Sequence, residues 1–267
     1  MIALTIESIP VFNLDGVQVD SIEKPKVFSY PIHKFLIRRV VDILQTHRKQ
    51  KQGRDPMAGK RTSAESLGTG YGLARVPRIK GSYRAAFVTM AVKGRSAHAP
   101  TSMKVIYKRV NKKERHLALL SAISSTGIPE LVAKRGHRIE GVKYIPLVVV
   151  DDIETVNSTK AAKDVLKKLG LWSDVERVYE GSRARSGKPR RRGRVKRVGR
   201  GPLIVVYEDR GVGLAMRNIP GVDVVELRSL NPEHLAPGGY PGRLTLWSLS
   251  AFKKLDEIVG EVYTAYA

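Results

Sequence analysis

Four acidic residues are the strongest candidates for catalytic chemistry in this sequence. Asp151 and Asp152 follow the apolar run YIPLVVV, and Glu208 and Asp209 follow the apolar run LIVVY. Ligands of open parallel sheets bind beyond the carboxyl ends of the strands, so these carboxylates could hold a divalent cation for phosphoryl transfer. Acids at strand ends also simply open the next turn. A metal-dependent enzyme acting on RNA therefore stays open as the alternative to a binding protein.

Two glycine-rich stretches match nucleotide-binding loops only in part. Leu73 stands where the dinucleotide fingerprint needs its third glycine, and Arg61 follows Lys60 where a P-loop needs Ser or Thr. The six histidines show no metal-ligand spacing, and the chain has no cysteine, which excludes disulfides and thiolate sites. The favoured interpretation therefore has no catalytic residue, no metal and no cofactor.

Basic side chains are concentrated in two internal stretches. Residues 45–100 hold 12 Lys and Arg against two acids, and residues 181–201 hold ten against none. The formal net charge is +23, of which the rest of the chain contributes only +3. A nearly neutral body with two concentrated basic segments is typical of a protein that binds a polyanion. Neither stretch has the periodic apolar face of a membrane-surface helix.

The residue types in these stretches favour RNA over DNA. Arginine outnumbers lysine in the second stretch, and a guanidinium binds phosphate through paired hydrogen bonds and stacks on bases. In the first stretch, Tyr71, Tyr83 and Phe87 alternate with cations and could stack on unpaired bases. A protein that reads duplex DNA usually presents a helix to the major groove, which neither stretch predicts.

The elements that position these stretches are predicted to form an α/β fold, a mostly parallel sheet with helices on both faces. Short β-branched apolar runs indicate buried strands, and amphipathic segments between them indicate helices. The expected strands are 2–6, 144–150, 203–207 and 222–227. The expected helices are 31–47, with Pro31 in its first turn, 111–127, with Asn111 as its N-cap and Gly127 and Pro129 ending it, 158–171, 213–218 and 248–263.

Residues 45–103 are expected to be a long extended loop. They contain seven glycines and no sustained apolar period, and connections beyond about 12–15 residues inside compact domains are usually functional or disordered. We expect this loop to be mobile until RNA orders it. Residues 181–201 lie between a predicted helix and a predicted strand, as a second, basic insertion loop. The expected organisation is one α/β domain over residues 1–267 that carries both loops.

The hydropathy pattern predicts a cytoplasmic protein. No apolar run approaches the about 18 residues of a membrane-spanning helix. The first ten residues lack the basic and then apolar order of a signal peptide.

Several long blocks of this sequence resemble the ribosomal protein L-four family of the large subunit, in its archaeal and eukaryotic form. The blocks run through nearly the whole chain. They are AGKRTSAESLGTGYGLARVPRIKG (58–81), AVKGRSAHAP (91–100), RVNKKERHLALLSAIS (109–124), KRGHRIE (134–140), SRARSGKPRRRGR (182–194), RNIPGVDV (217–224) and LAPGGYPGRLTLW (235–247).

The resemblance implies a structural role without catalysis. It implies a globular domain on the outside of the subunit and a loop that threads into 23S-type rRNA. The loop tip would help to line the nascent-peptide exit tunnel, opposite the hairpin of the L-twenty-two family protein. One departure is that Tyr71 stands where family members often carry arginine after the GTG element.

The predicted partners are large-subunit rRNA, neighbouring ribosomal proteins and the nascent polypeptide. The predicted tunnel-lining residues are Gly68, Gly70, Tyr71, Arg75 and Arg78. The predicted rRNA-binding residues of the first stretch are Arg48, Lys49, Lys51, Arg54, Lys60, Arg61, Arg75, Arg78, Lys80, Arg84, Lys93, Arg95 and His98. Those of the second stretch are Arg183, Arg185, Lys188, Arg190, Arg191, Arg192, Arg194, Lys196 and Arg197.

Overall fold

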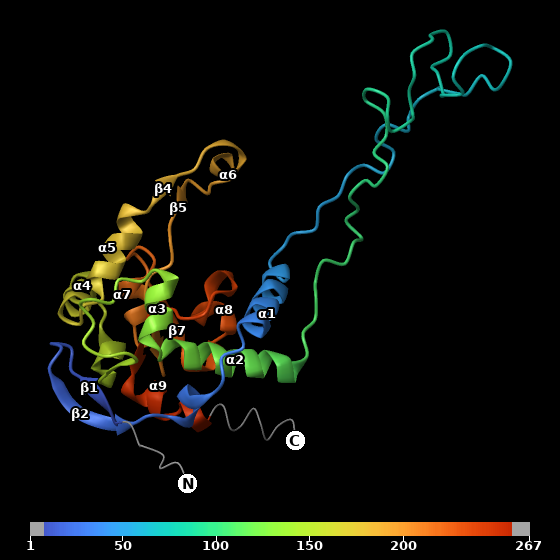
Figure 1. Cartoon of the computed structure of the whole chain (residues 1–267). Helices are drawn as coiled ribbons and strands as arrows, with labels where there is room; N and C mark the ends of the chain where they lie inside the picture. The colour runs from blue at the N-terminus through green and yellow to red at the C-terminus, as the bar shows by residue number, and fades with distance from the viewer. Residues whose placement is uncertain (1–7, 258–267) are drawn as a thin grey trace. The chain divides into compact units, whose positions relative to one another are not determined.

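A six-stranded sheet organises the computed structural model, which describes residues 8–257 (Figure 1). Its strands lie in the order β2, β1, β3, β8, β6, β7, and every neighbouring pair except β1 and β2 is parallel. The sheet strands are β1 Ser8–Phe12, β2 Gln18–Glu23, β3 Leu147–Val149, β6 Leu203–Val206, β7 Asp223–Glu226 and β8 Thr245–Ser248. A separate two-stranded hairpin consists of β4 Arg183–Ala184 and β5 Lys196–Arg197.

Helices fill the connections between the strands. The α-helices are α1 Lys34–Thr46, α2 Lys112–Thr126, α3 Pro129–Arg135, α4 Thr159–Lys168, α5 Trp172–Glu180, α6 Gly187–Arg191, α7 Val212–Met216, α8 Pro232–Leu235 and α9 Leu249–Lys253. Four short 3-10 helices are η1 Lys26–Ser29, η2 Asp151–Thr155, η3 Leu227–Ser229 and η4 Pro237–Gly239.

Both faces of the sheet are covered by helices. Alternate residues of a strand point to opposite faces. Val148 and Val205 therefore join one core cluster, which includes side chains of α1, α2, α8 and α9, whereas Val149 and Val206 join another, which includes side chains of α3, α4, α5 and α7. Each fully buried aliphatic side chain contributes about 1.5–3 kcal/mol relative to its exposed state, so these two layers hold the body together. The predicted fold class, a mostly parallel α/β sheet, is confirmed.

Several predicted elements are confirmed with shorter limits. The strands predicted at 144–150, 203–207 and 222–227 are β3, β6 and β7, and the helices predicted at 158–171 and 213–218 contain α4 and α7. Asn111 caps α2 as expected, because its Oδ1 accepts a hydrogen bond from Lys113 N at 3.0 Å.

Other predictions at element ends are wrong in detail. Pro31 precedes α1 instead of lying in its first turn. Gly127 caps the end of α2 as predicted, and Pro129, beyond that end, also opens α3 at a position where a missing N–H costs nothing. The closing helix is described only as α9, and the rest of the 248–263 prediction extends beyond the described residues. The strand predicted at 2–6 also lies outside them.

Strand β8 was not predicted, although it lies in the middle of the sheet. Its segment, TLWS, begins and ends with hydroxyl residues that are rarely buried without a partner. Here both have partners: Thr245 Oγ1 donates to Arg243 O at 3.0 Å, and Ser248 Oγ donates to a carboxylate oxygen of Glu154 at 2.9 Å. These local hydrogen bonds allow a strand with polar ends to be completely buried.

The chain divides into two units, residues 1–44 with 109–267 and residues 45–108. The first unit contains the sheet and its helices. Between the end of α1 at Thr46 and the start of α2 at Lys112, the described backbone has isolated bridges but no strand and no further helix. Apart from Thr46, no residue of this second unit is buried. The second unit therefore has no hydrophobic core of its own.

Candidate nucleic-acid interface

The predicted rRNA-binding residues of the first stretch all lie in the unit formed by residues 45–108. All of them are exposed except Arg78 and Arg95, which are half-buried. This unit holds 14 Lys and Arg residues and two acids. Two of its cations, Lys104 and Lys108, lie beyond residue 103, the predicted end of the loop.

The two acids of this unit each pair with one cation. Asp55 forms an ion pair with Arg61, and the hydrogen bond from that guanidinium lowers the pKa of the Asp55 carboxyl. Glu65 lies 3.2 Å from Lys80 Nζ. Both pairs are exposed, and such pairs contribute little to stability. The unit keeps an excess of 12 positive charges, which a polyanion could neutralise.

Arg78 is the centre of local order near the predicted loop tip. Its backbone forms isolated antiparallel bridges with Glu65 on one side and Ala85 on the other. The Arg78 guanidinium donates a hydrogen bond to Tyr83 O, and Ser66 Oγ donates to Arg75 O at 3.0 Å. Arg78 thus joins three chain segments, through its backbone at Glu65 and Ala85 and through its side chain at Tyr83.

The predicted tip residues other than Arg78 are exposed. Tyr71 has 67% of its surface exposed. Gly68 and Gly70 have φ angles of +76° and +94°, and a Cβ added to either would meet no atom within 4 Å. The positive φ angles favour glycine at both positions, and no neighbouring atom packs against either residue on its Cβ side.

A contrasting glycine closes the middle of the unit. A Cβ at Gly59 would lie 2.7 Å from Arg95 Cα, so two backbone segments meet there in a contact that only glycine permits. Arg95 continues this packing, because its guanidinium lies 5.6 Å from the Phe87 ring centroid. Phe87, expected to stack on bases, is thereby engaged within the protein.

An aromatic contact joins the two ends of this unit. The His47 and Tyr107 rings stack with their centroids 4.0 Å apart and an interplanar angle of 13°. His47 Nε2 is 2.9 Å from Lys108 O, and Lys108 N donates to Thr46 Oγ1 at 3.1 Å. Nearby, a hollow of about 910 Å³ is lined by apolar residues such as Met103 and Val105 together with basic ones such as Lys49 and Lys104. Sequence reasoning missed Tyr107, because a lone aromatic residue has no periodic signal.

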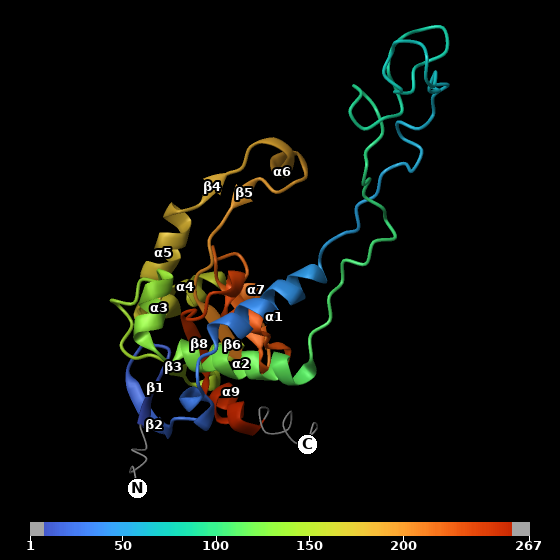
Figure 2. The same cartoon turned by 45° about the vertical axis from the view of Figure 1, so that its right-hand side comes forward.

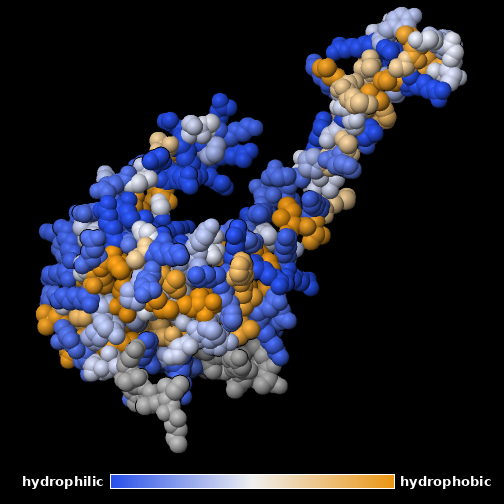
Figure 3. All heavy atoms as spheres, in the orientation of Figure 1, coloured by the Kyte–Doolittle hydropathy of each residue, from blue (hydrophilic) through white to orange (hydrophobic). Residues whose placement is uncertain are grey.

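The second basic stretch is a hairpin with a helical turn and not an irregular loop (Figures 1 and 2). Strands β4 and β5 pair Arg183 with Arg197 and Ala184 with Lys196, and α6 lies between them. Of its predicted contact residues only Arg185 is half-buried, and the others are exposed. Figure 3 shows the hydrophilic surface that results. Strands of two residues are too short for any sequence period to reveal them.

The hairpin brings like charges together. Arg183 and Arg197 lie directly opposite each other, and like charges in that position destabilise an antiparallel pair. Residues 181–201 contain no acid that could offset the repulsion. The nine cations from 183 to 197 repel one another in the free protein. Binding of phosphate groups would neutralise this repulsion.

Buried charges hold α5, the helix that leads into this hairpin. Asp174 is fully buried and accepts hydrogen bonds from His137 Nδ1 at 2.9 Å and Arg177 Nε at 2.8 Å. Burial opposes the ionisation of Asp174, but hydrogen bonds from His137, Arg177 and Arg138 N outweigh it and lower the pKa. Burial, together with the charges of Arg177 and Arg135, lowers the pKa of His137 although Asp174 acts to raise it. At neutral pH the pair therefore joins a neutral imidazole to a carboxylate.

A second set of charges holds the chain as it leaves the hairpin. Arg200 Nη1 donates to both carboxylate oxygens of Asp223 at 2.9 Å, and Arg177 Nη2 donates to Arg200 O at 3.0 Å. The buried Arg243 donates to Asp223 at 2.6 Å and to Gly201 O at 2.9 Å. Both ends of the hairpin are thus fixed to the body.

Three of the four acids considered for catalysis have structural roles, and the fourth, Asp152, is exposed. Asp151 accepts hydrogen bonds from Ser250 N at 2.8 Å and Ser250 Oγ at 2.5 Å, at the start of α9. Asp209 accepts from the backbone N–H groups of two residues at the start of α7, and Glu208 pairs with Arg210 at 3.1 Å. The two acid pairs follow strands that are not neighbours, because β8 separates β3 from β6 by two strand spacings, about 10 Å in all. Within residues 8–257 no group of three His, Asp or Glu side chains is placed to hold a metal ion.

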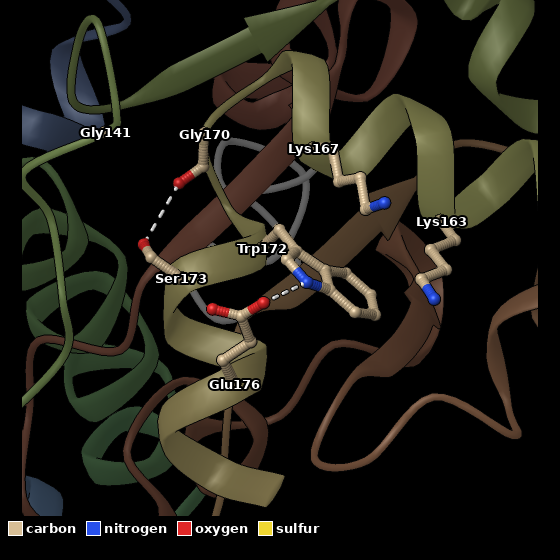
Figure 4. Close-up of a pocket in the computed structure, with 7 residues that line it drawn as sticks. All are labelled: Gly141, Lys163, Lys167, Gly170, Trp172, Ser173 and Glu176. Atoms are coloured by element: carbon tan, nitrogen blue, oxygen red, sulfur yellow. Dashed lines mark hydrogen bonds between the residues drawn. The ribbon is translucent and has the colours of Figure 1, made fainter.

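A hollow of about 540 Å³ lies between α4 and α5, and Figure 4 shows the side chains that line it. The ammonium groups of Lys163 and Lys167 lie 4.9 Å and 5.8 Å from the Trp172 ring centroid. Trp172 Nε1 donates to Glu176 at 2.6 Å, which fixes the orientation of the indole. Here the two ammonium groups already interact with the indole, so the hollow gives no clear indication of a ligand.

No single helix in the described part of the chain is long and apolar enough to cross a membrane. Within these described residues, α2 and α3 reach that length and apolar character only when they are taken together, and the chain bends by 95° at the break between them.

The chain is similar to known ribosomal proteins along most of its length. A model of the ribosomal protein L4/L1 family matches residues 22–258. Large ribosomal subunit protein uL4 of Methanopyrus kandleri is 50% identical over 257 residues, which cover 94% of this chain and 99% of the relative. The proteins of the same name from Methanosphaera stadtmanae and Aeropyrum pernix are 47% and 46% identical over 250 residues, covering 94% and 93% of this chain and 96% and 92% of the relatives.

Proposed function

This chain belongs to the ribosomal protein L4/L1 family, and on that premise we propose that it is a structural constituent of the large ribosomal subunit that binds 23S-type rRNA and supports subunit assembly. The observation that carries the proposal is the distribution of charge. Two segments with net charges of +12, over residues 45–108, and +10, over residues 181–201, adjoin a body that is close to neutral. Release of counterions from RNA phosphates favours binding to such segments.

The unit of residues 45–108 is proposed to be the extended loop that penetrates the rRNA. Its lack of a buried core supports this, because such a segment can be ordered by filling space between RNA helices. Doubled back as two arms, its 64 residues could reach about 100 Å at most. That length is sufficient to cross much of a large ribonucleoprotein.

The segment from Gly68 to Arg78 is proposed to line the nascent-peptide exit tunnel. The open surroundings of Gly68 and Gly70 support this, since a tunnel wall needs a thin backbone, and the exposed ring of Tyr71 is placed to contact a passing chain. Arg78 then supports the tip from behind, and the nascent polypeptide meets Tyr71, at a position where the family resemblance implies arginine. The L-twenty-two family protein is the proposed neighbour across the tunnel.

The hairpin of β4 and β5 is proposed to be a second rRNA contact on the globular body. Its fixed ends support this role, because contacts fixed at both ends lose less entropy when they bind. The alternative function, a metal-dependent enzyme acting on RNA, loses support, since three of its four acids are used for capping and ion pairing and no three His, Asp or Glu side chains within residues 8–257 are placed to hold a metal ion.

Sedimentation tests this function directly. A tagged copy of the chain is expressed in its own organism, and the extract is separated on a sucrose gradient at low salt. We expect the tagged chain to sediment with large subunits and with whole ribosomes in the cytoplasm. If most of the chain stays at the top of the gradient while large subunits sediment normally, the proposed function is wrong.

A further inference from the structure

Three aromatic side chains of the body are exposed outside both basic stretches: Tyr179 near the end of α5, with 69% of its surface exposed, and Phe35 and Tyr240, which lie on neighbouring segments. Phe35 in α1 has 91% of its surface exposed, and Tyr240, just after η4, has 66% exposed. Aromatic residues usually bury most of their surface, so rings this exposed suggest contact with another molecule. Together with Lys34 and Arg38 we define Phe35 and Tyr240 as the stacking patch.

The patch brings together segments that are distant in sequence. Phe35 and Arg38 lie one turn apart on the same face of α1. Arg38 packs against the backbone of Gly239, where an added Cβ would come within 2.9 Å of Arg38 Cγ and 3.1 Å of its Cα. Gly239 has a φ of +81° as well, so glycine is required there twice over. Phe35 therefore lies one helical turn from Arg38, and Tyr240 directly follows the glycine against which Arg38 packs.

The turn that presents Tyr240 is held by its backbone. Arg135 donates hydrogen bonds to Tyr240 O and, at 2.8 Å, to Pro237 O. Gly242 N donates to Ser125 Oγ at 3.1 Å. None of these bonds uses the Tyr240 ring, which stays exposed on a fixed support. This turn has the sequence PGGYPG (237–242) and lies outside both basic stretches.

The charges of the patch favour a polyanion. Among the described residues, neither Lys34 nor Arg38 has a carboxylate within ion-pair distance, whereas the adjacent Arg39 lies 3.5 Å from Glu114. A protein surface docking through Phe35 and Tyr240 would meet these cations at the centre of the contact. An RNA strand offers what both residue types require, because its bases stack on aromatic rings while its phosphates bind cations.

We propose that the stacking patch binds unpaired nucleotides of rRNA, with bases against Phe35 and Tyr240 and phosphates at Lys34 and Arg38. The identity of the RNA as rRNA rests on the proposed function. The site itself is additional to the loop and the hairpin, and it would anchor the body where both basic stretches are absent.

The experiment measures binding of the full-length chain to large-subunit rRNA transcribed from the same organism, at several salt concentrations between 50 and 200 mM. Phe35→Ala and Tyr240→Ala should each lower the affinity about 5- to 100-fold without changing its salt dependence, because stacking releases no counterions. Arg38→Ala should make the logarithmic salt slope shallower by about 0.7, the value for one contact to a single strand. The matched control is Leu214→Ala, which removes a side chain with 70% exposure on α7.

A second arm separates this inference from the proposed function. In it, the hairpin cations from Lys188 to Arg197 are replaced. If that variant loses affinity while Phe35→Ala and Tyr240→Ala bind like Leu214→Ala, the stacking patch is wrong and the rRNA function stands. If the parent chain itself shows no salt-dependent binding to the transcript, the function fails. If Phe35→Ala leaves rRNA affinity intact but prevents a neighbouring protein from joining the subunit, the patch docks protein and our inference is overturned.

Discussion

Arg78 shows how a residue predicted to contact RNA can act within the protein. From the sequence alone, Arg78 is predicted to contact rRNA like the other arginines of its stretch, because charge and glycine content are the only signals in that stretch. In the structure Arg78 is half-buried and bridges the segments at Glu65, Tyr83 and Ala85. Its neighbour Arg75 is exposed and keeps the role that the sequence predicts.

Replacing Arg78 by alanine should loosen the tip of the loop. In the free chain we expect the 45–108 unit to exchange most of its amide protons rapidly, since almost none of it is buried, with slower exchange at hydrogen-bonded amides such as the mutually paired ones of Glu65 and Arg78. Arg78→Ala removes the hydrogen bond from the charged guanidinium to Tyr83 O, which should raise the exchange rate of these two amides about tenfold. Arg75→Ala is the control and should leave them unchanged. Strong protection throughout residues 55–95 without RNA would contradict the account.

The buried His137 and Asp174 pair makes the body sensitive to acid. The pKa of His137 is lowered in the folded state, so the unfolded chain binds more protons below about pH 6.5, its ordinary value. The lowered pKa of Asp174 acts in the same direction at lower pH. The free energy of unfolding should therefore decrease between pH 7.5 and 5.

His137→Gln should make this decrease smaller without abolishing it, because burial also lowers the pKa values of His116 and His234. Denaturant titrations at pH 7.5, 6.5 and 5.5 on parent and variant measure the difference. An equal loss of stability with pH in both proteins would show that His137 has no part in it.

Elements with a sustained period could be predicted, and short or polar ones could not. The apolar runs that became β3 and β6 are buried on both faces of the sheet, and Asn111 is a strong helix signal, so all three predictions are confirmed. Strand β8 was missed because its Thr245 and Ser248 look like loop residues until their partners are known. Its absence from the predicted sheet made the two pairs of acids seem able to meet.

The hairpin of β4 and β5 should account for a measurable part of the salt dependence of RNA binding. A chain making 6–10 phosphate contacts should lose roughly 10³–10⁵ in affinity between 50 and 200 mM salt. Replacing the seven cations from Lys188 to Arg197 by glutamine removes groups that are all exposed, so the body should stay folded and the slope should become shallower. Filter binding at four salt concentrations measures it. An unchanged slope would mean that the hairpin does not touch RNA.

For the whole molecule, the division into two units predicts that the body folds without the loop. Deleting residues 64–92 with a short Gly/Ser closure removes no buried side chain and should alter loop-closure entropy by only about 0.6 kcal/mol. We expect a thermal unfolding midpoint close to that of the parent, measured by circular dichroism at 222 nm. If the deletion unfolds the body, the loop is not an independent appendage.

The class of partner could be predicted from the distribution of charge in the sequence, but the geometry of the interface could not. The stacking patch illustrates the limit, because Phe35 reads as one more apolar residue of an amphipathic helix, and its 91% exposure depends on how α1 packs. Likewise, the ion pairs that fix the hairpin join Arg177, Arg200 and Asp223, which no local pattern brings together.

The central claim is that two basic segments bind this chain to large-subunit rRNA, and a cryo-EM map of the large subunit from the same organism tests it most directly. The account predicts that residues 45–108 lie among rRNA helices, with Gly68, Gly70 and Tyr71 on the wall of the exit tunnel, and that the guanidinium groups from Arg183 to Arg197 lie within hydrogen-bonding distance of phosphates. A map in which both segments face solvent, while the body alone contacts the subunit, would contradict it.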